Sequence, residues 1–470
     1  MAALGVNEEE RMERLLRVTT CLAMCGYGAQ VGQLAGAARA FYSDAQVWGA
    51  QARHRGGAYG RTHLMHAAYM GSTARVQYLL DRGAAVDAAT VGGWTALMLA
   101  SVKGHLETVR CLVKRGGANV NVASTTVGFT ALMWACDKGH LEIVRYLVEL
   151  AGANANAARN TDGQTVLMKA SKKGHLEIAR CLVEDGGANV NAAQTDDGMT
   201  SLMWASQNGH LETVRFLVEH GVAYVNAGQT DDGMTSLMWA SRKGHFEIVR
   251  CLVERGDSNV NAVQTDDGST SLMWASQEGH LEIVRYLVER GGANVNAAMT
   301  TDGCTALMCA IAKGCLEIAR ILVERGGANV NAAMTTDGGT ALLWASQSGH
   351  PLLASYLLRR GAAVNAALFP SGITALTCAC WKGHASIILL LYAAGADLDA
   401  ATTGADPGPA AISLGSTPLM LASREGHVEC VQALLGLGAN AGLADAAGLT
   451  AHGHAERFPK VRAALTGSLP

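Results

Sequence analysis

Nine histidines recur at one position of the chain, each directly after a glycine, and most of them are 35 residues apart. Histidine is a common metal ligand and proton carrier near neutral pH. If each histidine lies on its own helical layer, neighbours are about 10 Å apart, whereas zinc ligands lie about 2 Å from a shared ion. In one copy Cys315 takes the place of the histidine. We therefore predict a structural role for this set: His105, His140, His175, His210, His245, His280, His350, His384 and His427.

Sequence patterns of catalysis are missing from the chain. It has no GxxxxGK[ST] phosphate-binding loop, no HExxH zinc-protease motif and no GxSxG nucleophile motif. The glycine-rich stretch GLGANAG near residue 436 lies in a repeated turn. We expect neither an enzyme nor a cofactor site or metal site.

The twelve cysteines are scattered along the sequence. Three of them, Cys111, Cys181 and Cys251, share one repeat position with the aromatic residues of other copies, which suits small hydrophobic side chains of a core. The N-terminus is acidic and lacks the apolar stretch of a secretory signal. We therefore expect reduced thiols and a location in the cytosol, with the nucleus as the alternative.

The composition favours small helices that pack closely. Hydrophobic residues make up 49% of the 470 residues and aromatic residues only 5%. The formal net charge is −3, from 37 basic and 40 acidic residues, so no global field attracts nucleic acid. No apolar stretch reaches the roughly 18 residues that a membrane-spanning helix needs. We expect a soluble monomer that does not insert into membranes.

A threonine marks the same point in twelve copies of a repeat, and seven successive spacings are 35 residues. In the copy TSLMWASQNGHLETVRFLVEHG, Thr200 can cap a first helix, Gly209 ends it, and a second helix runs from His210 to about Glu219. The second helix has a broad apolar stripe that one hairpin cannot bury, whereas stacked hairpins can. The sequence therefore predicts a helical solenoid. The threonines are Thr62, Thr95, Thr130, Thr165, Thr200, Thr235, Thr270, Thr305, Thr340, Thr374, Thr417 and Thr450.

The Gly-x-Thr start, the Gly-His joint, the Leu-Glu-Ile-Val helix and the closing GANVNA turn resemble the ankyrin-repeat family over about residues 61 to 470. The resemblance implies an all-α fold, an elongated and curved solenoid of helical hairpins with β-turn fingers. It also implies binding of a partner protein along the concave face. The expected domains are an N-terminal helical segment over residues 1–60, about eleven repeats over 61–449 and a C-terminal capping half-repeat over 450–470.

Three features depart from the ankyrin pattern. Each internal repeat has two residues beyond the common length, so we expect longer fingers. The 43-residue interval from Thr374 to Thr417 predicts a surface insertion near residues 401–415. Methionine stands where the family favours a histidine that bonds to the threonine: Met98, Met133, Met168, Met203, Met238, Met273 and Met308.

A row of tryptophans at one repeat position is the first candidate binding surface. On a helical wheel Trp204 lies about 200° from the core residue Leu202. Two interpretations stay open, because these indoles can pack against the next repeat or can serve as aromatic anchors for a partner. Lys169 at the same position favours partial exposure, since an unpaired buried lysine is costly. The row is Trp134, Trp204, Trp239, Trp274 and Trp344.

Two further sets match positions that contact partners in ankyrin proteins. One is the variable pair before each Gly-His joint, and the other is the finger residue before each threonine. An ordinary solvated surface is the alternative for each single residue. The joint candidates are Asp137, Lys138, Lys172, Lys173, Gln207, Asn208, Arg242, Lys243, Gln277, Glu278, Trp381 and Lys382, and the finger candidates are Trp94, Phe129, Gln164, Met199, Met234, Ser269, Cys304 and Gly339.

Acidic pairs stand at the expected finger tips and form either a negative ridge that guides a basic partner or simply solvated turns. The pairs are Asp196 with Asp197, Asp231 with Asp232 and Asp266 with Asp267.

Two other functions compete with a binding scaffold. In the N-terminal segment, Leu34, Arg39, Phe41 and Trp48 resemble the latter half of an F-box, although the Leu-Pro opening of that family is absent. This resemblance implies an adaptor for a ubiquitin ligase, and an N-terminal cap is the simpler interpretation. The near-identity of the repeats, with DDGMTSLMWAS at both 196 and 231, favours a structural spacer.

Overall fold

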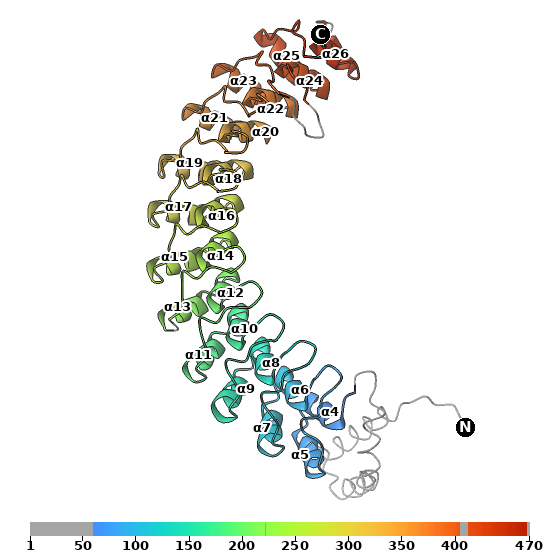
Figure 1. Cartoon of the computed structure of the whole chain (residues 1–470), viewed down its shortest axis with the longest axis vertical. Coiled ribbons are helices and arrows are strands. Elements are labelled where there is room, and N and C mark those ends of the chain that lie inside the picture. The colour runs from blue at the N-terminus through green and yellow to red at the C-terminus, as the bar shows by residue number, and fades with distance from the viewer. Residues whose placement is uncertain (1–59, 221, 405–411, 468–470) are drawn as a thin grey trace, which may run out of the picture. The chain divides into compact units, whose positions relative to one another are not determined.

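The computed structural model describes residues 60–220, 222–404 and 412–467 (Figure 1). The chain divides into two compact units, the first ending at Thr161 and the second beginning at Asp162. The regular structure of the described residues is helical, apart from isolated β-bridges. The predicted N-terminal segment with its F-box-like residues lies outside the described residues. Among the described helices, none combines the length and the apolar character that crossing a bilayer would require.

The described helices come in pairs, in which the even-numbered helix is the first helix of a repeat and the odd-numbered helix is the second. The first unit contains α4 (His63–Tyr69), α5 (Thr73–Asp81), α6 (Ala96–Lys103), α7 (Leu106–Lys114), α8 (Ala131–Lys138), α9 (Leu141–Arg145) and the π-helix η1 (Tyr146–Leu150). The second unit contains α10 (Val166–Lys173), α11 (Leu176–Glu184), α12 (Ser201–Gln207), α13 (Leu211–Glu219), α14 (Ser236–Lys243), α15 (Phe246–Glu254), α16 (Ser271–Glu278), α17 (Leu281–Glu289), α18 (Ala306–Lys313), α19 (Leu316–Glu324), α20 (Ala341–Gln347), α21 (Pro351–Arg359), α22 (Ala375–Lys382), α23 (Ala385–Ala393), α24 (Pro418–Glu425), α25 (Val428–Leu437), α26 (Ala451–His454) and α27 (Pro459–Leu465).

The repeated threonine starts the first helix of each repeat. Thr235 Oγ1 accepts the backbone N–H of Met238 at 3.3 Å, which satisfies one of the free donors at the start of α14. The helix ends at Gly244, which has a φ of 80°. The predicted threonine cap is therefore confirmed, and the spacing of threonine and glycine limits each first helix to about two turns.

Within each unit, a helix packs against its counterpart in the next repeat. In the second unit α14 packs between α12 and α16, and α15 packs between α13 and α17 (Figure 1). Leu237, Met238 and Ala240 of α14 are at most 1% exposed. The small alanine allows neighbouring first helices to approach closely, while leucine and methionine fill the space between the two helical layers. The methionines three residues after each threonine are thus core residues.

A short finger precedes each first helix. In the finger before α14, Gly228 and Thr235 form an antiparallel bridge, and the backbone N–H of Gln229 donates to Met234 O at 3.0 Å. The backbone N–H of Thr230 donates to Asp197 O of the preceding finger at 3.1 Å. The fingers are therefore bonded into a row, as well as being attached to their own helices.

The second asparagine of the NVNA turn connects each repeat to the next. Asn226 Oδ1 accepts the backbone N–H of Asn259 at 2.6 Å, and Asn226 Nδ2 donates to Asp257 O at 3.2 Å. Asn261 bonds in the same way to Asn294 and Gly292. An asparagine suits this position because its amide provides one acceptor and two donors.

The predicted insertion lies between α23 and α24. Its residues 405–411 are outside the described residues. At its base, the Thr402 hydroxyl donates to Ser413 O at 2.7 Å and the Thr402 backbone N–H donates to Ser416 O at 3.0 Å. These bonds bring the chain back to Thr417, which caps α24.

Candidate functional site

The C-terminal ends of the first helices and the adjoining fingers form the surface on which most sequence candidates lie, and we call it the groove surface. The tryptophans of the row are half-buried. In three repeats of the second unit, the indole Nε1 donates to the side-chain oxygen of a buried glutamine in the finger of the same repeat. The pairs are Trp204 with Gln194 at 2.5 Å, Trp239 with Gln229 at 2.8 Å and Trp274 with Gln264 at 2.7 Å.

Cationic side chains cover part of these indole faces. Lys172 Nζ lies 3.6 Å from the ring centre of Trp204, and the Arg242 guanidinium lies 4.3 Å from that of Trp274. Arg242 also lies 5.7 Å from the ring of Trp239. The indoles are thus held by a hydrogen bond at one edge and by a cation–π contact on a face. Half-buried indoles are compatible both with packing against the next repeat and with a role as aromatic anchors, so both interpretations stay predictions.

Among the finger candidates, Phe129, Met199 and Met234 are buried, with 6%, 2% and 1% of their surface exposed. This corrects the prediction that they contact a partner. The turn before each threonine explains the difference. Asp197 Oδ1 accepts the backbone N–H of Met199 at 2.9 Å, so the chain turns and the methionine side chain enters the core.

The variable residues before the joints remain accessible. Their side chains lie at the end of the first helices, beyond the packed turn. Asp137 and Lys138 pair with each other at 3.0 Å, and Asn208 Nδ2 donates to Trp204 O at 2.8 Å. Among the exposed members are Lys138, Asn208, Lys243, Gln277 and Lys382, and among the half-buried members are Asp137, Gln207, Arg242, Glu278 and Trp381.

In the first unit the groove surface contains a depression of about 450 Å³. The sequence predicted Trp94 of its wall as a finger contact but did not predict the depression itself. Tyr69 at the end of α4, Trp94 in the finger before α6 and Lys103 at the end of α6 line it. Val91 at its edge is 88% exposed. The signal that could have found it is the aromatic residue Tyr69 in the last turn of α4, where most other repeats have a polar residue and Trp381 is also aromatic.

The lining residues combine aromatic and cationic groups. Lys103 Nζ lies 4.5 Å from the ring centre of Tyr69, and the Arg61 guanidinium lies 5.7 Å from it. Hydrogen bonding to Lys103 and its positive charge lower the pKa of Tyr69. The Trp94 ring stacks on Trp134, with the ring centres 4.7 Å apart. This depression therefore has an aromatic wall and a positive edge.

Histidines of the joints bond to the preceding repeat within each unit, which confirms the structural role predicted for them. His245 Nε2 lies 3.2 Å from Gln207 O of the preceding repeat. A Cβ on Gly209, which has a φ of 81°, would lie 2.7 Å from the His245 ring. The same ring-to-carbonyl contact is made by His105, His140, His210, His280, His384 and His427.

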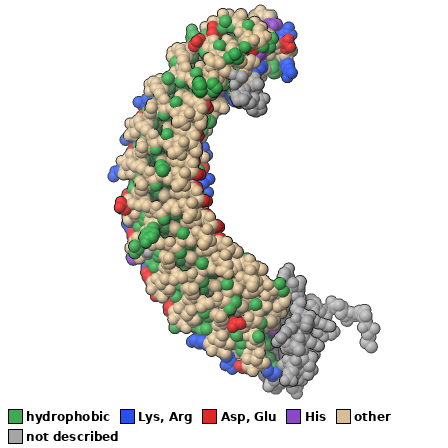
Figure 2. Space-filling model, in the orientation of Figure 1, with side chains coloured by type: hydrophobic (Ala, Val, Ile, Leu, Met, Phe, Trp, Pro, Cys, Tyr) green, Lys and Arg blue, Asp and Glu red, His purple; other side chains and the backbone are tan. Residues whose placement is uncertain are grey.

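The acidic tips of the fingers are only partly solvated. Asp196, Asp231 and Asp266 are exposed, whereas Asp197 and Asp232 are half-buried. Partial burial, followed by nearby carboxylates, raises the pKa of Asp197 and of Asp232. Figure 2 shows acidic and basic side chains interspersed along the edge of the molecule.

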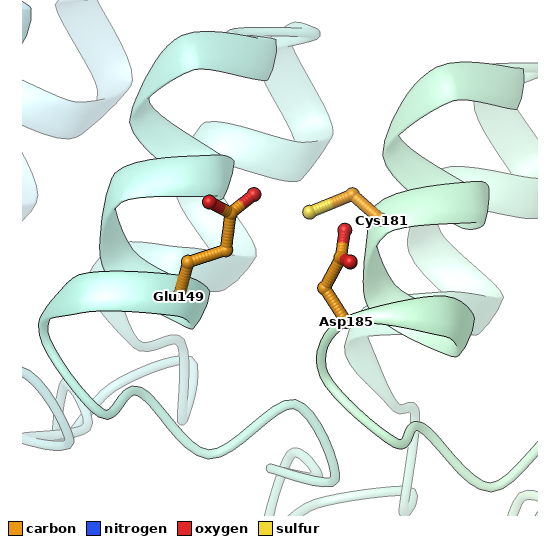
Figure 3. A group of neighbouring side chains, drawn as sticks. All are labelled: Glu149, Cys181 and Asp185. Atoms are coloured by element: carbon orange, nitrogen blue, oxygen red, sulfur yellow. The ribbon is translucent and has the colours of Figure 1, made fainter.

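Figure 3 draws side chains that could be considered for a metal ion. Cys181 and Asp185 lie one helical turn apart at the end of α11, with the thiol sulfur and a carboxylate oxygen within 4.8 Å. Cys181 is buried and Asp185 is exposed. Two such groups on one turn fall short of the three or four ligands of protein zinc sites. Glu149, also labelled, belongs to η1 of the first unit.

Comparison with known families identifies the repeat. A family model described as ankyrin repeats (three copies) matches residues 34–124, 116–194, 188–263, 257–334 and 327–402. A second model, described as ankyrin repeat, matches residues 414–446. The two models together cover most of the sequence. No curated protein matches it.

Proposed function

The chain belongs to the ankyrin-repeat family, and from this premise we propose that it is a non-catalytic scaffold that holds a partner protein against its groove surface. Ankyrin repeats are generally modules of protein–protein interaction. The proposal includes a location in the cytosol or nucleus. The scattered cysteines of the sequence support this location, since disulfides are rare in those compartments.

The depression in the first unit is the observation that carries the proposal. Tyr69 and Trp94 offer aromatic surface, and Lys103 with Arg61 places positive charge at the edge. Aromatic residues and arginine are enriched where interfaces gain most of their binding energy. An apolar side chain of a partner segment, flanked by acidic residues, fits this combination of surface and charge.

Each unit carries further candidate contacts on its own groove surface. We retain as partner contacts the exposed joint residues Lys138 of the first unit and Asn208, Lys243, Gln277 and Lys382 of the second, together with the accessible parts of the tryptophan row. The buried finger residues are no longer included. Since the indoles are held by Gln194, Gln229 and Gln264, a partner meets preordered aromatic surface and little side-chain entropy is lost on binding.

Substitutions at the depression test the proposal. The variants Val91→Asp and Lys103→Glu change exposed side chains at its edge. The control is Lys114→Glu, because Lys114 is also exposed and also ends its helix, but on α7, a second helix. Each variant is fused to a labelling enzyme, and the proteins labelled in cells are quantified by mass spectrometry. Thermal melts of the purified variants verify that each one is folded.

We expect that the wild type and Lys114→Glu label a common set of proteins. In both groove variants the labelling level of this set should fall about tenfold or more. If folded groove variants label the same proteins at the same level as the wild type, the scaffold proposal is wrong at this surface. If substitution of Lys243 and of Gln277 also leaves the labelled proteins unchanged, the result supports the structural spacer, which the near-identical repeats favour. Co-purification of a ligase core subunit with the full chain would instead support the adaptor.

A further inference from the structure

Two cysteine sulfurs meet on the groove surface of the second unit. Cys304 lies in the finger before α18, and Cys309 lies in α18 itself. Their sulfurs are 3.8 Å apart. Cys309 is 7% exposed, and Cys304 is half-buried. Cys304 is therefore the more accessible of the two cysteines, and the Cys309 sulfur lies within contact distance of the Cys304 sulfur.

This repeat differs from its neighbours at both positions. The residue before the threonine and the residue of the tryptophan row stand five places apart in every copy, and they are Met234 with Trp239 and Ser269 with Trp274 in the two preceding repeats. In the following repeat they are Gly339 and Trp344. Cysteine occupies both positions in this copy alone. The fold of the repeat therefore brings two thiols together here.

The surroundings divide the two thiols into a reactive one and a less reactive one. A hydrogen bond from Cys309 lowers the pKa of Cys304, while the same bond and burial raise the pKa of Cys309. The backbone N–H of Cys304 donates to Asp302 Oδ1 at 2.8 Å, which fixes the turn that presents its side chain. The thiolate is the nucleophile in thiol–disulfide exchange, so Cys304 is the group that attacks first.

We propose that Cys304 and Cys309 form a reversible intramolecular disulfide by exchange with a small disulfide such as oxidised glutathione. The Cys304 thiolate attacks one sulfur of glutathione disulfide, whose S–S bond breaks and releases one glutathione thiolate. The Cys309 sulfur then attacks Cys304 Sγ, forms the new S–S bond and releases the second glutathione thiolate. The two protons of the protein thiols pass to the two glutathione thiolates, so the protein loses two electrons and glutathione disulfide gains them.

The geometry allows this bond with a small movement. The sulfurs must approach by roughly 1.8 Å to reach the disulfide length of about 2.0 Å. Cys304 belongs to a finger, which can shift more easily than the packed helix α18. The disulfide would join the finger to its helix at a point between Trp274 and Trp344 of the groove surface. This modification is independent of the proposed scaffold function.

Peptide mass spectrometry of the full chain tests the proposal directly. Trypsin releases residues 291–313, in which Cys304 and Cys309 are the only cysteines. The same digest releases residues 361–382, which contain Cys378 and Cys380. These two cysteines are two residues apart on α22 and are 4% and 0% exposed, so they provide an internal control. The protein is equilibrated in glutathione buffers of increasing oxidised fraction, denatured in the presence of N-ethylmaleimide so that buried reduced thiols also react, and digested.

We expect peptide 291–313 to lose two hydrogen atoms and to resist alkylation as the ratio of oxidised to reduced glutathione rises. The ratio at which this happens should be at least about tenfold lower than the ratio at which it happens in peptide 361–382. Equal alkylation of the two peptides at every ratio would overturn the proposal. A lasting glutathione adduct on Cys304 of the wild type, or a disulfide between two chains, would do the same.

Single substitutions identify the order of attack. In Cys309→Ser we expect a stable glutathione adduct on Cys304, because no second sulfur displaces it. In Cys304→Ser we expect Cys309 to stay unmodified, because it is buried. An adduct on Cys309 and none on Cys304 contradicts the assigned order. The wild-type measurement keeps the disulfide itself testable even if a variant folds poorly.

Discussion

The indoles of the second unit are positioned by a residue ten places earlier in the chain. Trp239 and Trp274 each donate to a glutamine that is buried in the finger of the same repeat. The glutamine oxygen would have no other donor if the indole were absent, and a buried acceptor without a donor is costly. This bond explains how an amphipathic aromatic residue can be both half-exposed and well ordered.

Phenylalanine substitutions should separate this bond from packing. Trp274→Phe keeps an aromatic ring but removes the N–H, and we expect it to lower the free energy of unfolding by about 1–2 kcal/mol. Trp344→Phe is the matched control, since the residue ten places earlier is Met334, and it should cost clearly less. Urea unfolding followed by circular dichroism measures both. Equal losses would show that the glutamine bond contributes little.

Two residues carry a backbone conformation that glycine has elsewhere in the array. Val222 and Asp257 both have a φ of 52°, at the position where Gly187 has 61° and Gly292 has 68°. A left-handed conformation costs a residue with a Cβ about 1–2 kcal/mol, and a β-branched residue is among the least suited.

Val222→Gly is therefore expected to stabilise the protein by up to about 1 kcal/mol, since the lost strain outweighs the added freedom of the unfolded chain. The reverse change Gly187→Val should destabilise it. The measurement is the shift of the thermal midpoint relative to the wild type. A lower midpoint for Val222→Gly would mean that the valine makes compensating contacts.

At the scale of elements, the joint between the two helices of a repeat is also a joint between repeats. The His245 ring lies on Gly209 and bonds to Gln207 O, so the end of α12 and the start of α15 are held together. Glycine is required because its left-handed φ and the missing Cβ leave room for the ring. The Gly-His pair thus serves both as a helix stop and as a contact between neighbours.

The stability of this joint should depend on pH. Burial, opposed by the hydrogen bond to Gln207 O, lowers the pKa of His245 below its usual value of 6.5. The unfolded chain then binds a proton more readily than the folded one, so the contribution is complete above about pH 7 and is lost as the pH falls below about 6.5. We expect the thermal midpoint to fall between about pH 7 and pH 5, and His245→Asn to remove part of this fall. Parallel pH profiles of variant and wild type would refute the assignment to His245.

At the scale of the whole chain, stability comes from contacts between neighbouring repeats within each unit. Finger bonds such as Thr230 N–H to Asp197 O, and asparagine bonds such as Asn226 to Asn259, join each repeat to the next one only. In such an array stability is close to a sum over repeats and their interfaces. The number of repeats can therefore change without loss of the fold.

Removal of residues 200–234 tests this additivity, because it joins Met199 to Thr235 and restores the sequence DDGMTSLMWAS at the junction. We expect a folded protein with unchanged helix signal per residue and a slightly lower unfolding midpoint. The control deletion of residues 200–229 leaves a broken finger and should cause a larger loss. Similar losses in both deletions would argue against additive stacking.

Local spacing determined most of the fold from the sequence alone. Thr235, Gly244 and the histidine after it recur at one period, and they mark where helices start, stop and join because capping and left-handed turns depend on near neighbours in the chain. The period also placed the tryptophan row and the joint residues on one surface. The structural role of His245 followed from the same spacing.

Only the tertiary structure decided which side chains remain accessible on that surface. The turn at Asp197 directs Met199 inward, and the finger glutamine holds Trp204 half-buried, neither of which the repeat pattern distinguishes. The depression around Tyr69 and the contact of Cys304 with Cys309 depend on how a finger folds back onto its helix. Burial and proximity arise from this return of the chain in space, whereas periodicity records only the order of residues along it.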